Sequence, residues 1–239
     1  QRLRVGQLRG SGPMQVVSGL LDYPKVHFEA PPRQGLEERL NAFIDWFNQS
    51  LNDSLLDPLL RAGITHLWFV TLHPFDDGNG RITRTLTDLS LAQMDEQSIR
   101  LYAMSTAILN KRKSYYEILE QTQKNDSDIT DWLVWFLDTL NDSLEKTLAQ
   151  ISRTLFKSQF WHKYSNLALS EEQRKVLNRL LDGGENGFEH GISASQYQKV
   201  AKTSKATATR HLSDLLEKKC IVKLEGGGRN TRYQINTQL

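Results

Sequence analysis

Apolar residues recur at helical spacing through the larger, N-terminal part of this chain. From Gly35 to about Lys157 they return every three or four residues, with charges on the faces between them. The stretch from Leu55 to Leu72 is apolar on most sides, so we expect a buried helix that ends at His73-Pro74, since a proline disfavours helix before it. The pattern predicts five helices, at about residues 36–47, 55–72, 78–91, 111–123 and 128–157.

A different pattern precedes these helices. Residues 14–18 and 25–28 alternate between apolar and polar side chains, and a turn-like segment, residues 19–24, separates them. Such a pair predicts a β-hairpin. Pro31-Pro32 then breaks the strand pattern and admits the first helix.

After Asn166 the chain changes character again. Ser170 followed by two glutamates is typical of a helix start, and the helix is expected to run through Leu181. Two more short helices, at residues 193–202 and 205–218, precede two β segments at residues 221–224 and 231–235 with a glycine-rich turn between them. Three helices and such a hairpin predict a winged helix-turn-helix domain.

These patterns predict a mainly α protein, a helical bundle with a β-hairpin followed by a small winged helix. We place the domains at residues 1–34 for the hairpin region, 35–160 for the helical core and 161–239 for the winged helix. The 239 residues are 38% hydrophobic and 24% charged, as in soluble globular proteins. No apolar run approaches eighteen residues, which excludes a membrane span.

Two further features bear on location and partners. Residues 1–4 are neither an initiator Met nor a signal peptide, so we expect a piece of a longer chain, and the single Cys220 suits a reducing cytoplasm. Residues 167–239 carry a net charge of +4 and residues 1–166 carry −2, which indicates modules with different partners. The candidate DNA contacts of the winged helix are Lys199, Lys202, Lys205, Arg210, Arg229 and Arg232.

DNA is not the only partner that such a domain suits. Asp214 and Glu217 lie on the same predicted recognition helix and weigh against DNA binding. Many winged helices serve only protein contacts or dimerisation. A DNA or protein partner and a homodimer are therefore all open for this domain.

The candidate chemistry lies in residues 73–84, His-Pro-Phe-Asp-Asp-Gly-Asn-Gly-Arg-Ile-Thr-Arg. A histidine at a helix end suits a base, and Asp77 suits a metal ion. The Gly-Asn-Gly turn opens a helix whose first N–H groups form an anion site. Arg81 and Arg84 lie near each other on its first turn. Each feature alone is commonly structural, but together they indicate phosphoryl or nucleotidyl transfer.

This segment resembles the motif of the Fic family, His-Pro-Phe-x-Asp/Glu-Gly-Asn-Gly-Arg-x-x-Arg, at every fixed position. The resemblance implies a Fic-type bundle that transfers AMP from ATP to a Thr, Tyr or Ser hydroxyl of a target protein and releases pyrophosphate. It implies that His73 is the base and that Asp77 holds Mg²⁺ or Mn²⁺. It also implies that Gly78, Asn79 and Gly80 form the anion hole, Asn79 on the α-phosphate, while Arg81 and Arg84 bind the outer phosphates. Phe75 is expected to be a core anchor.

The resemblance extends over about residues 5–155. The hairpin at 14–28 is similar to the family's flap, which aligns the target protein by strand addition. Tyr116 and Gln123 resemble its adenine contacts, although many relatives have Asn in place of Gln123. The inhibitory pattern Ser/Thr-x-x-x-Glu-Gly/Asn is missing from the sequence, so we expect it upstream or on a partner.

Other functions remain open on the sequence alone. The same site could remove AMP from a modified protein, or the Fic-like part could serve only as the nucleotide sensor of a transcription regulator. Transfer of the γ-phosphate is typical of relatives with Lys at the position of Gly80. A metal-dependent hydrolase would need His66 and His73 as ligands, and their spacing of seven is not that of a helical zinc site.

Overall fold

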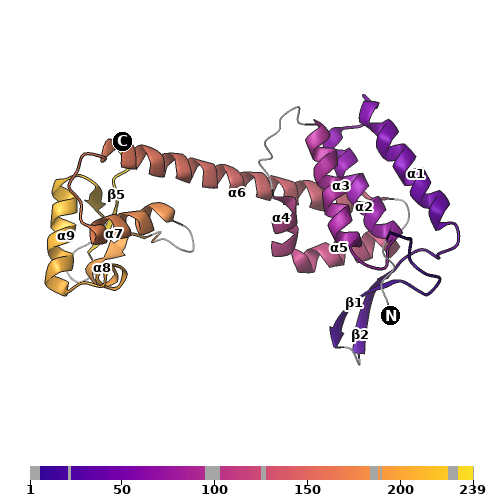
Figure 1. Cartoon of the computed structure of the whole chain (residues 1–239), viewed down its shortest axis with the longest axis horizontal. Coiled ribbons are helices and arrows are strands. Elements are labelled where there is room, and N and C mark those ends of the chain that lie inside the picture. Colours follow the sequence, from indigo (N-terminus) through magenta and orange to yellow (C-terminus); the bar gives the residue numbers. More distant parts are fainter. Residues whose placement is uncertain are drawn as a thin grey trace. The chain divides into compact units, whose positions relative to one another are not determined.

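The chain is mainly helical and divides into two compact units, residues 1–147 and 148–239 (Figure 1). A computed structural model describes residues 6–20, 23–94, 103–124, 128–183, 188, 190–225 and 231–238. Within these ranges no helix has the length and apolar character that a bilayer crossing requires.

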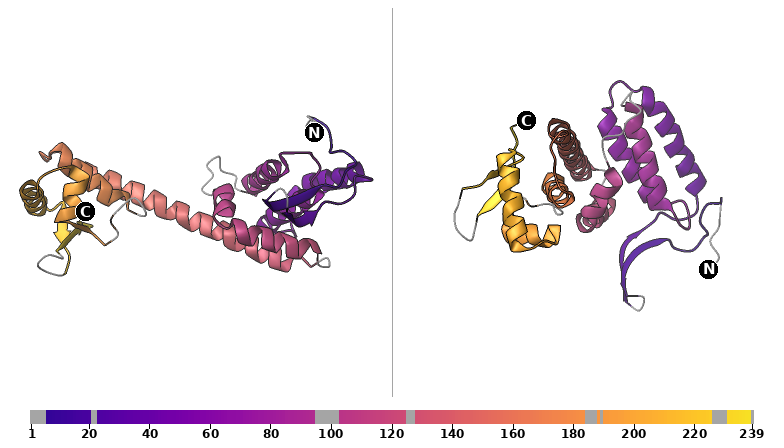
Figure 2. Two further views of the ribbon diagram at one scale, coloured as in Figure 1. Left: turned by 90° about the horizontal axis from the view of Figure 1, so that it is seen from below. Right: turned by 60° about the vertical axis from the view of Figure 1, so that its left-hand side comes forward.

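The first unit is a helical bundle from which a β-hairpin projects (Figures 1 and 2). Its elements, in chain order, are β1 (Gln15–Leu20), β2 (Tyr23–Glu29), α1 (Leu36–Gln49), the 3-10 helix η1 (Ser50–Asn52), α2 (Pro58–Leu72), α3 (Asn79–Met94), α4 (Met104–Asn110), α5 (Arg112–Lys124) and the first part of α6 (Thr130–Lys163). The sequence pattern predicted all of these except α4 and the short η1.

Helix α2 is largely buried, as the sequence predicted. The Asp57 carboxylate caps it by accepting the N–H groups of Leu59 and Leu60, and Pro58 occupies its first turn. Proline fits there because the first N–H groups of a helix have no intrahelical acceptor. The helix therefore begins three residues later than predicted, at Pro58, and Leu55 is 95% exposed.

Helix α6 packs closely on α2 at Gly63. A Cβ added to this glycine would lie 2.9 Å from the Leu133 side chain, so a larger residue would force the helices apart. The fully buried Trp132 donates its indole N–H to the Gly63 carbonyl at 2.9 Å. This contact anchors the N-terminal part of α2, and His73 lies at the C-terminal end of the same helix.

The hairpin joins β1 to β2 in antiparallel register. Val16 pairs with Phe28, and a β-bulge follows between Val16 and Val17. A bulge bends its strand and increases the local twist. These two paired side chains turn toward the bundle, where they reach the cavity described below.

The second unit contains the end of α6, α7 (Glu171–Asp182), β3 (Ile192–Ser193), α8 (Ala194–Ala201), α9 (Lys205–Glu217), β4 (Ile221–Lys223) and β5 (Arg232–Ile235). Its antiparallel sheet has the order β3-β5-β4. Reciprocal capping boxes at Ser170–Gln173 and Ser193–Gln196 set the starts of α7 and α8. The three helices and the β4–β5 pairing agree with the sequence pattern, whereas β3 was not predicted.

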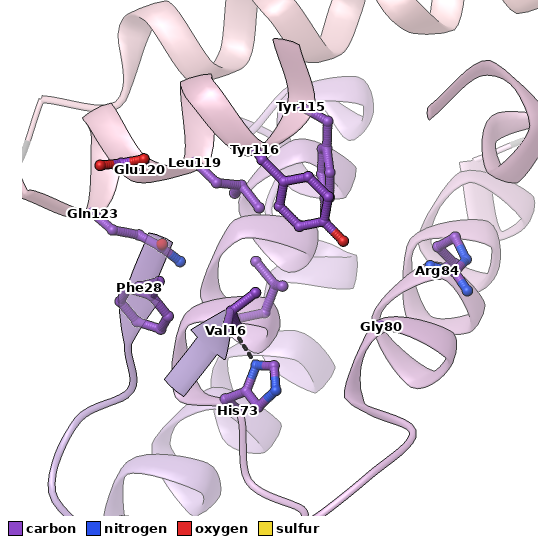
Figure 3. A pocket seen from close by; sticks show the side chains of 11 residues that line it. Val16, Phe28, His73, Gly80, Arg84, Tyr115, Tyr116, Leu119, Glu120 and Gln123 are labelled. Atoms are coloured by element: carbon purple, nitrogen blue, oxygen red, sulfur yellow. Dashed lines mark hydrogen bonds between the residues drawn. The ribbon is translucent and has the colours of Figure 1, made fainter. Parts of the chain in front are cut away.

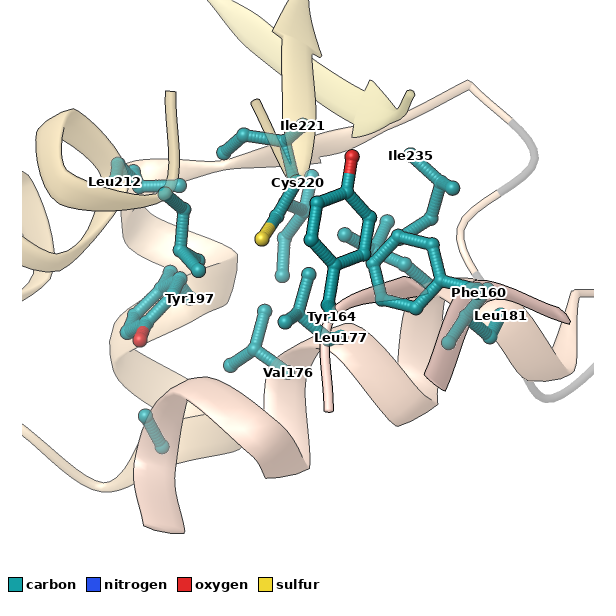
Figure 4. Packing of buried hydrophobic residues seen from close by; sticks show 14 of the residues in the cluster. Phe160, Tyr164, Val176, Leu177, Leu181, Tyr197, Leu212, Cys220, Ile221 and Ile235 are labelled. Carbon is teal, nitrogen blue, oxygen red and sulfur yellow. The ribbon is translucent and has the colours of Figure 1, made fainter. Parts of the chain in front are cut away.

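The core of this unit begins on α6 (Figure 4). Phe160, in the last turn of α6, and Tyr164, just after its end, pack with α7, α9 and the sheet. The boundary expected after residue 160 therefore falls earlier, within α6. Cys220 lies fully buried in the same core, and burial raises the pKa of its thiol to about 11, so it is a packing residue rather than a reactive thiol.

Candidate functional site

His73 ends α2 in a left-handed conformation. Its φ is 45° and its ψ 56°, and its N–H still donates to the Phe69 carbonyl at 3.1 Å. This conformation is unusual for a residue other than glycine, and such strain persists only where surrounding contacts hold it.

The imidazole of His73 is fixed in one tautomer. Its Nδ1 lies 3.2 Å from the Val70 carbonyl, drawn as a dashed line in Figure 3. A carbonyl oxygen can only accept, so Nδ1 carries the hydrogen and the lone pair lies on Nε2. Burial lowers the pKa of His73, the Val70 bond opposes this, and the Arg9 guanidinium lowers it further. The neutral ring with an open Nε2 is the form that a base needs.

The turn after His73 is held by Asn79 and Phe75. The Asn79 side chain accepts the Phe75 N–H at 2.9 Å and donates to the Phe75 carbonyl at 2.7 Å. Phe75 packs among the partly buried apolar residues of the core, 6.4 Å from the Phe69 ring, which agrees with its expected role as an anchor. Gly78 has a φ of +83°, which a residue with a Cβ adopts only under strain.

The start of α3 presents backbone donors. Arg81 and Ile82 give their N–H groups to the Gly78 carbonyl. The first N–H groups of a helix have no acceptor within it, which leaves those of Asn79 and Gly80 for an anion. A Cβ on Gly80 would lie 3.4 Å from a guanidinium nitrogen of Arg84, so this arginine folds back over the helix start.

A cavity of about 180 Å³ brings most of these groups together (Figure 3). His73, Gly80 and Arg84 form one side, and α5 forms the facing wall. The hairpin closes a further side with Val16 and Phe28. The remaining lining residues are Val70, Tyr115, Tyr116, Leu119, Glu120 and Gln123. Five of the residues selected from the sequence, namely His73, Gly80, Arg84, Tyr116 and Gln123, therefore share this cavity.

The other selected residues lie outside the lining. Asn79 is buried beneath the turn, and both polar atoms of its side chain are engaged with Phe75. Arg81 and Asp77 are exposed, and the Asp77 carboxylate accepts the Gly78 N–H at 2.6 Å. Arg81, Asp77 and Gly78 are not among the residues that line the cavity.

On α5, Gln123 offers an unpaired acceptor. Its amide nitrogen donates to the Thr71 hydroxyl at 2.9 Å, and its buried carbonyl oxygen has no partner in the described residues. A buried polar atom without a partner is costly and marks a place where a ligand can bind. The neighbouring Tyr116 is partly exposed and presents its ring to the cavity (Figure 3).

This chain is similar to a known protein family and to individual members of it. A profile of the Fic/DOC family matches residues 3–91. This chain contains a Fic/DOC family domain. It is 33% identical to "Protein adenylyltransferase Fic" of Nematostella vectensis over 96 residues. These aligned residues are 40% of this chain and 21% of that protein. Over 52 residues it is 44% identical to "Protein adenylyltransferase fic-1" of Caenorhabditis elegans, which covers 22% of this chain and 10% of that protein.

A solved structure has a similar fold. A Fic family protein from Desulfovibrio desulfuricans G20 aligns with 97% of this chain and 63% of its own, with a TM-score of 0.50 and 20% sequence identity. That level of identity shows the fold alone. The chain spans about a fifth or less of the curated relatives named above.

The first unit contains a buried series of polar side chains that the sequence pattern did not predict. The Tyr115 hydroxyl lies 3.0 Å from His66 Nε2, and His66 Nδ1 lies 2.9 Å from the Thr87 hydroxyl. Thr87 donates its own hydrogen to the Thr83 carbonyl, so His66 must donate to Thr87 and accept from Tyr115. Thr83 in turn donates to the Asn79 carbonyl at 2.8 Å.

This chain of hydrogen bonds ties α5 through α2 to the first turn of α3. Burial lowers the pKa of His66 to about 3, so the ring stays neutral and both nitrogens stay engaged. His66 therefore cannot serve as a metal ligand with His73. No cluster of three or more metal-binding side chains was found in the part of the chain that the structure describes. The missed signal is the run of Thr83 and Thr87 on the buried face of α3.

Proposed function

We propose that this chain is a protein adenylyltransferase, which transfers AMP from ATP to a Thr, Tyr or Ser hydroxyl of a target protein and releases pyrophosphate. The observation that carries the proposal is the open Nε2 of His73 in a cavity shared with Gly80 and Arg84. The names of the relatives at 33% and 44% identity support the same activity.

In this proposal His73 acts as the general base. Its Nε2 takes the proton of the target hydroxyl while the hydroxyl oxygen attacks the α-phosphorus. The bond between the α-phosphorus and the oxygen bridging it to the β-phosphate breaks, and pyrophosphate leaves with the bonding electron pair. The Val70 carbonyl keeps the ring oriented throughout, because it holds Nδ1–H.

In this proposal the negative charge of the phosphates is neutralised by the turn after His73 and by the first residues of α3. The N–H groups of Asn79 and Gly80 would bind the α-phosphate, and Arg84 would bind the outer phosphates from within the cavity. Arg81 would reach the same phosphates from the exposed side of the first turn. The Asn79 side chain shapes the turn, so we assign its backbone rather than its amide to the α-phosphate. Gly78 allows the left-handed conformation on which this turn depends.

Asp77 would hold the metal ion, Mg²⁺ or Mn²⁺. Magnesium is commonly bound by one or two carboxylates together with substrate phosphates, rather than by a complete protein cage. A single exposed carboxylate beside the phosphate turn fits that requirement. When bound, the ion would neutralise charge on the phosphate oxygens.

The adenine ring would lie between Tyr116 on α5 and the apolar pair on the hairpin, Val16 and Phe28. The target protein would dock on the hairpin, residues 14–28. Each strand of this two-stranded sheet has one edge without a described neighbour, which suits an added strand.

Gln123 is expected to select adenine over guanine. Its unpaired carbonyl oxygen can accept from the 6-amino group of adenine, whereas guanine has a carbonyl at that position. Replacing Gln123 with leucine should weaken ATP binding about 3- to 10-fold, the worth of one hydrogen bond of roughly 1 kcal/mol. It should also narrow the preference for ATP over GTP, as measured by calorimetry.

The matched control is Gln121→Leu, an exposed position on the same helix that does not line the cavity. It should leave both affinities unchanged. An ATP/GTP ratio that stays the same in Gln123→Leu would remove Gln123 from base recognition.

We further propose that the second unit is a winged helix-turn-helix with α9 as its recognition helix. The element order α7, β3, α8, α9, β4 and β5 with a three-stranded antiparallel sheet supports this assignment. Lys199, Lys202, Lys205 and Arg210 are exposed, as a DNA contact requires. Arg232 donates to the Gly191 carbonyl at 2.9 Å, and Arg229 with the rest of the turn 226–230 lies outside the described residues.

Duplex binding tests the DNA assignment. The chain should retard a short DNA duplex at low salt, and the double variant Lys205→Ala/Arg210→Ala should weaken this about 10-fold, since each lost phosphate contact lowers affinity. The control is Lys113→Ala/Lys146→Ala, which removes two exposed cations from the other unit. Absence of any retardation by the parent chain would leave a protein partner or a second copy as the ligand of this unit.

A further inference from the structure

Arg9 is a buried arginine that lies against the turn after His73. The residue as a whole is 2% exposed. Its Nε donates to the His73 carbonyl at 2.9 Å, and one of its terminal nitrogens donates to the Pro31 carbonyl at 2.5 Å. Pro31 lies just after β2, so one guanidinium bridges the end of the hairpin and the end of α2.

The backbone around Arg9 follows the same turn. The Arg9 N–H donates to the Pro74 carbonyl at 2.9 Å, and the Gly10 N–H lies 3.4 Å from an Asp76 carboxylate oxygen. Three bonds thus run in order along residues 73, 74 and 76. On its other side, the Arg9 carbonyl accepts from Arg33 Nε at 2.8 Å.

The placement of this guanidinium is costly. Burial lowers the pKa of Arg9, against the opposing effect of the nearby Asp76 carboxylate, and the guanidinium donates to two neutral carbonyls. Desolvating a guanidinium is expensive even with a carboxylate nearby, so a position of packing value alone would favour an apolar residue. One of these bonds instead holds the carbonyl of His73, whose backbone is in the left-handed conformation.

We propose that Arg9 is a positioning residue that holds His73 in its left-handed conformation and couples it to the hairpin. Because both carbonyls bind one planar guanidinium, movement of the hairpin end is transmitted to the base. Arg9 does not line the cavity, so it acts on His73 rather than on the nucleotide. The consequence for transfer rests on the proposed adenylyltransferase function, whereas the effect on His73 does not.

The test compares Arg9→Lys and Arg9→Met with the parent chain. Lysine keeps the charge but has no planar pair of donors for both carbonyls, and methionine keeps only the apolar stem. The measurement is the initial rate of AMP transfer to proteins of a source-cell lysate at saturating ATP. This rate should fall about 10- to 100-fold in Arg9→Met, because a misplaced catalytic group lowers the rate to about this extent. Arg9→Lys should lose less, and the Kd for ATP should change less than about 3-fold in both.

A second readout needs no transfer activity. Nitrogen NMR of the His73 ring should show hydrogen on Nδ1 in the parent chain and a mixture of tautomers in Arg9→Met, since the contact with Val70 is no longer enforced. Arg39→Met is the control, because Arg39 donates to the Pro32 and Gln34 carbonyls in the same corner, and its hydrogen bonds within the described residues do not reach residues 73–76. This control should keep the parent's rate and spectrum.

The outcomes are distinct. A folded Arg9→Met chain with the parent's His73 spectrum would overturn the proposal, as would loss of ATP affinity in step with the rate. If the parent chain transfers no AMP, the proposed function fails, while the His73 spectrum still decides the role of Arg9.

Discussion

Replacing His73 with alanine is expected to reduce AMP transfer about 100- to 10,000-fold, the contribution of a positioned general base. The Nε2 lone pair is lost, while Gly80 and Arg84 remain in place to bind phosphate. The measurement is the initial rate at which label on the α-phosphate of ATP enters protein. The Kd for ATP should change much less than the rate, because the missing interaction forms mainly in the transition state.

The pH dependence of the parent chain gives an independent check on the same residue. Burial, with the nearby Arg9 charge, lowers the pKa of His73 below its ordinary 6.5. A base must be unprotonated, so activity should be full above pH 6.5 and fall only as the pH drops through the lowered pKa. The other charged or titratable groups around this cavity are Arg84, Tyr115, Tyr116 and Glu120. A loss of activity that already begins above pH 6.5 as the pH is lowered would contradict the assignment of His73 as the buried base.

Replacing Arg84 with alanine is expected to raise the Kd for ATP about 10- to 100-fold. A hydrogen bond to a charged group contributes roughly 1.5–3 kcal/mol, and every 1.4 kcal/mol is a factor of ten. Arg84 lies within the cavity beside Gly80, so its guanidinium can meet the outer phosphates at short range. Calorimetry with ATP and with AMP separates the contribution of the outer phosphates, which AMP lacks. The loss of affinity in Arg84→Ala should therefore be smaller for AMP than for ATP.

Arg81→Ala provides the comparison for Arg84. Arg81 is exposed and outside the cavity lining, so its removal should raise the Kd for ATP by less than about 5-fold, as for a screened surface contact. Equal losses for ATP and AMP in Arg84→Ala would assign this arginine to the fold instead of to the outer phosphates. Circular dichroism of each variant shows whether the helices are retained.

The sequence predicted the helices whose apolar stripes are long and whose ends carry strong local signals. Helix α2 combines a nearly continuous apolar run with the end signal at His73-Pro74, and α7 begins at the Ser170 cap. The hairpin was predicted because alternation has a period of two. Local chemistry decided each of these elements, so a single sequence was sufficient.

Other elements depend on contacts that the sequence does not display. Helix α4 has only seven residues, and β3 has two and exists through its pairing with β5. Leu55 fits the apolar pattern of α2 but lies before the Asp57 cap, so it is exposed. Such short or marginal elements are stabilised by tertiary contacts rather than by their own periodicity.

The same distinction applies to the site. The sequence singled out His73, the turn that follows it and Arg84, because these residues lie within one twelve-residue segment, and the structure brings His73, Gly80 and Arg84 to one cavity. It placed Asn79 on the α-phosphate, and the structure shows that the side-chain amide of this residue is engaged with Phe75. It missed Arg9, which is 64 residues from its partner His73 along the chain. A partner at that separation has no local signature.

The most direct test of the central claim uses ATP labelled in turn on the α- and the γ-phosphate, incubated with the chain and a source-cell lysate. The account predicts that α-label is retained in a protein band, that γ-label leaves as pyrophosphate, and that His73→Ala abolishes the retained label. Retention of γ-label in protein, or α-label that persists in His73→Ala, would contradict transfer of AMP by this site.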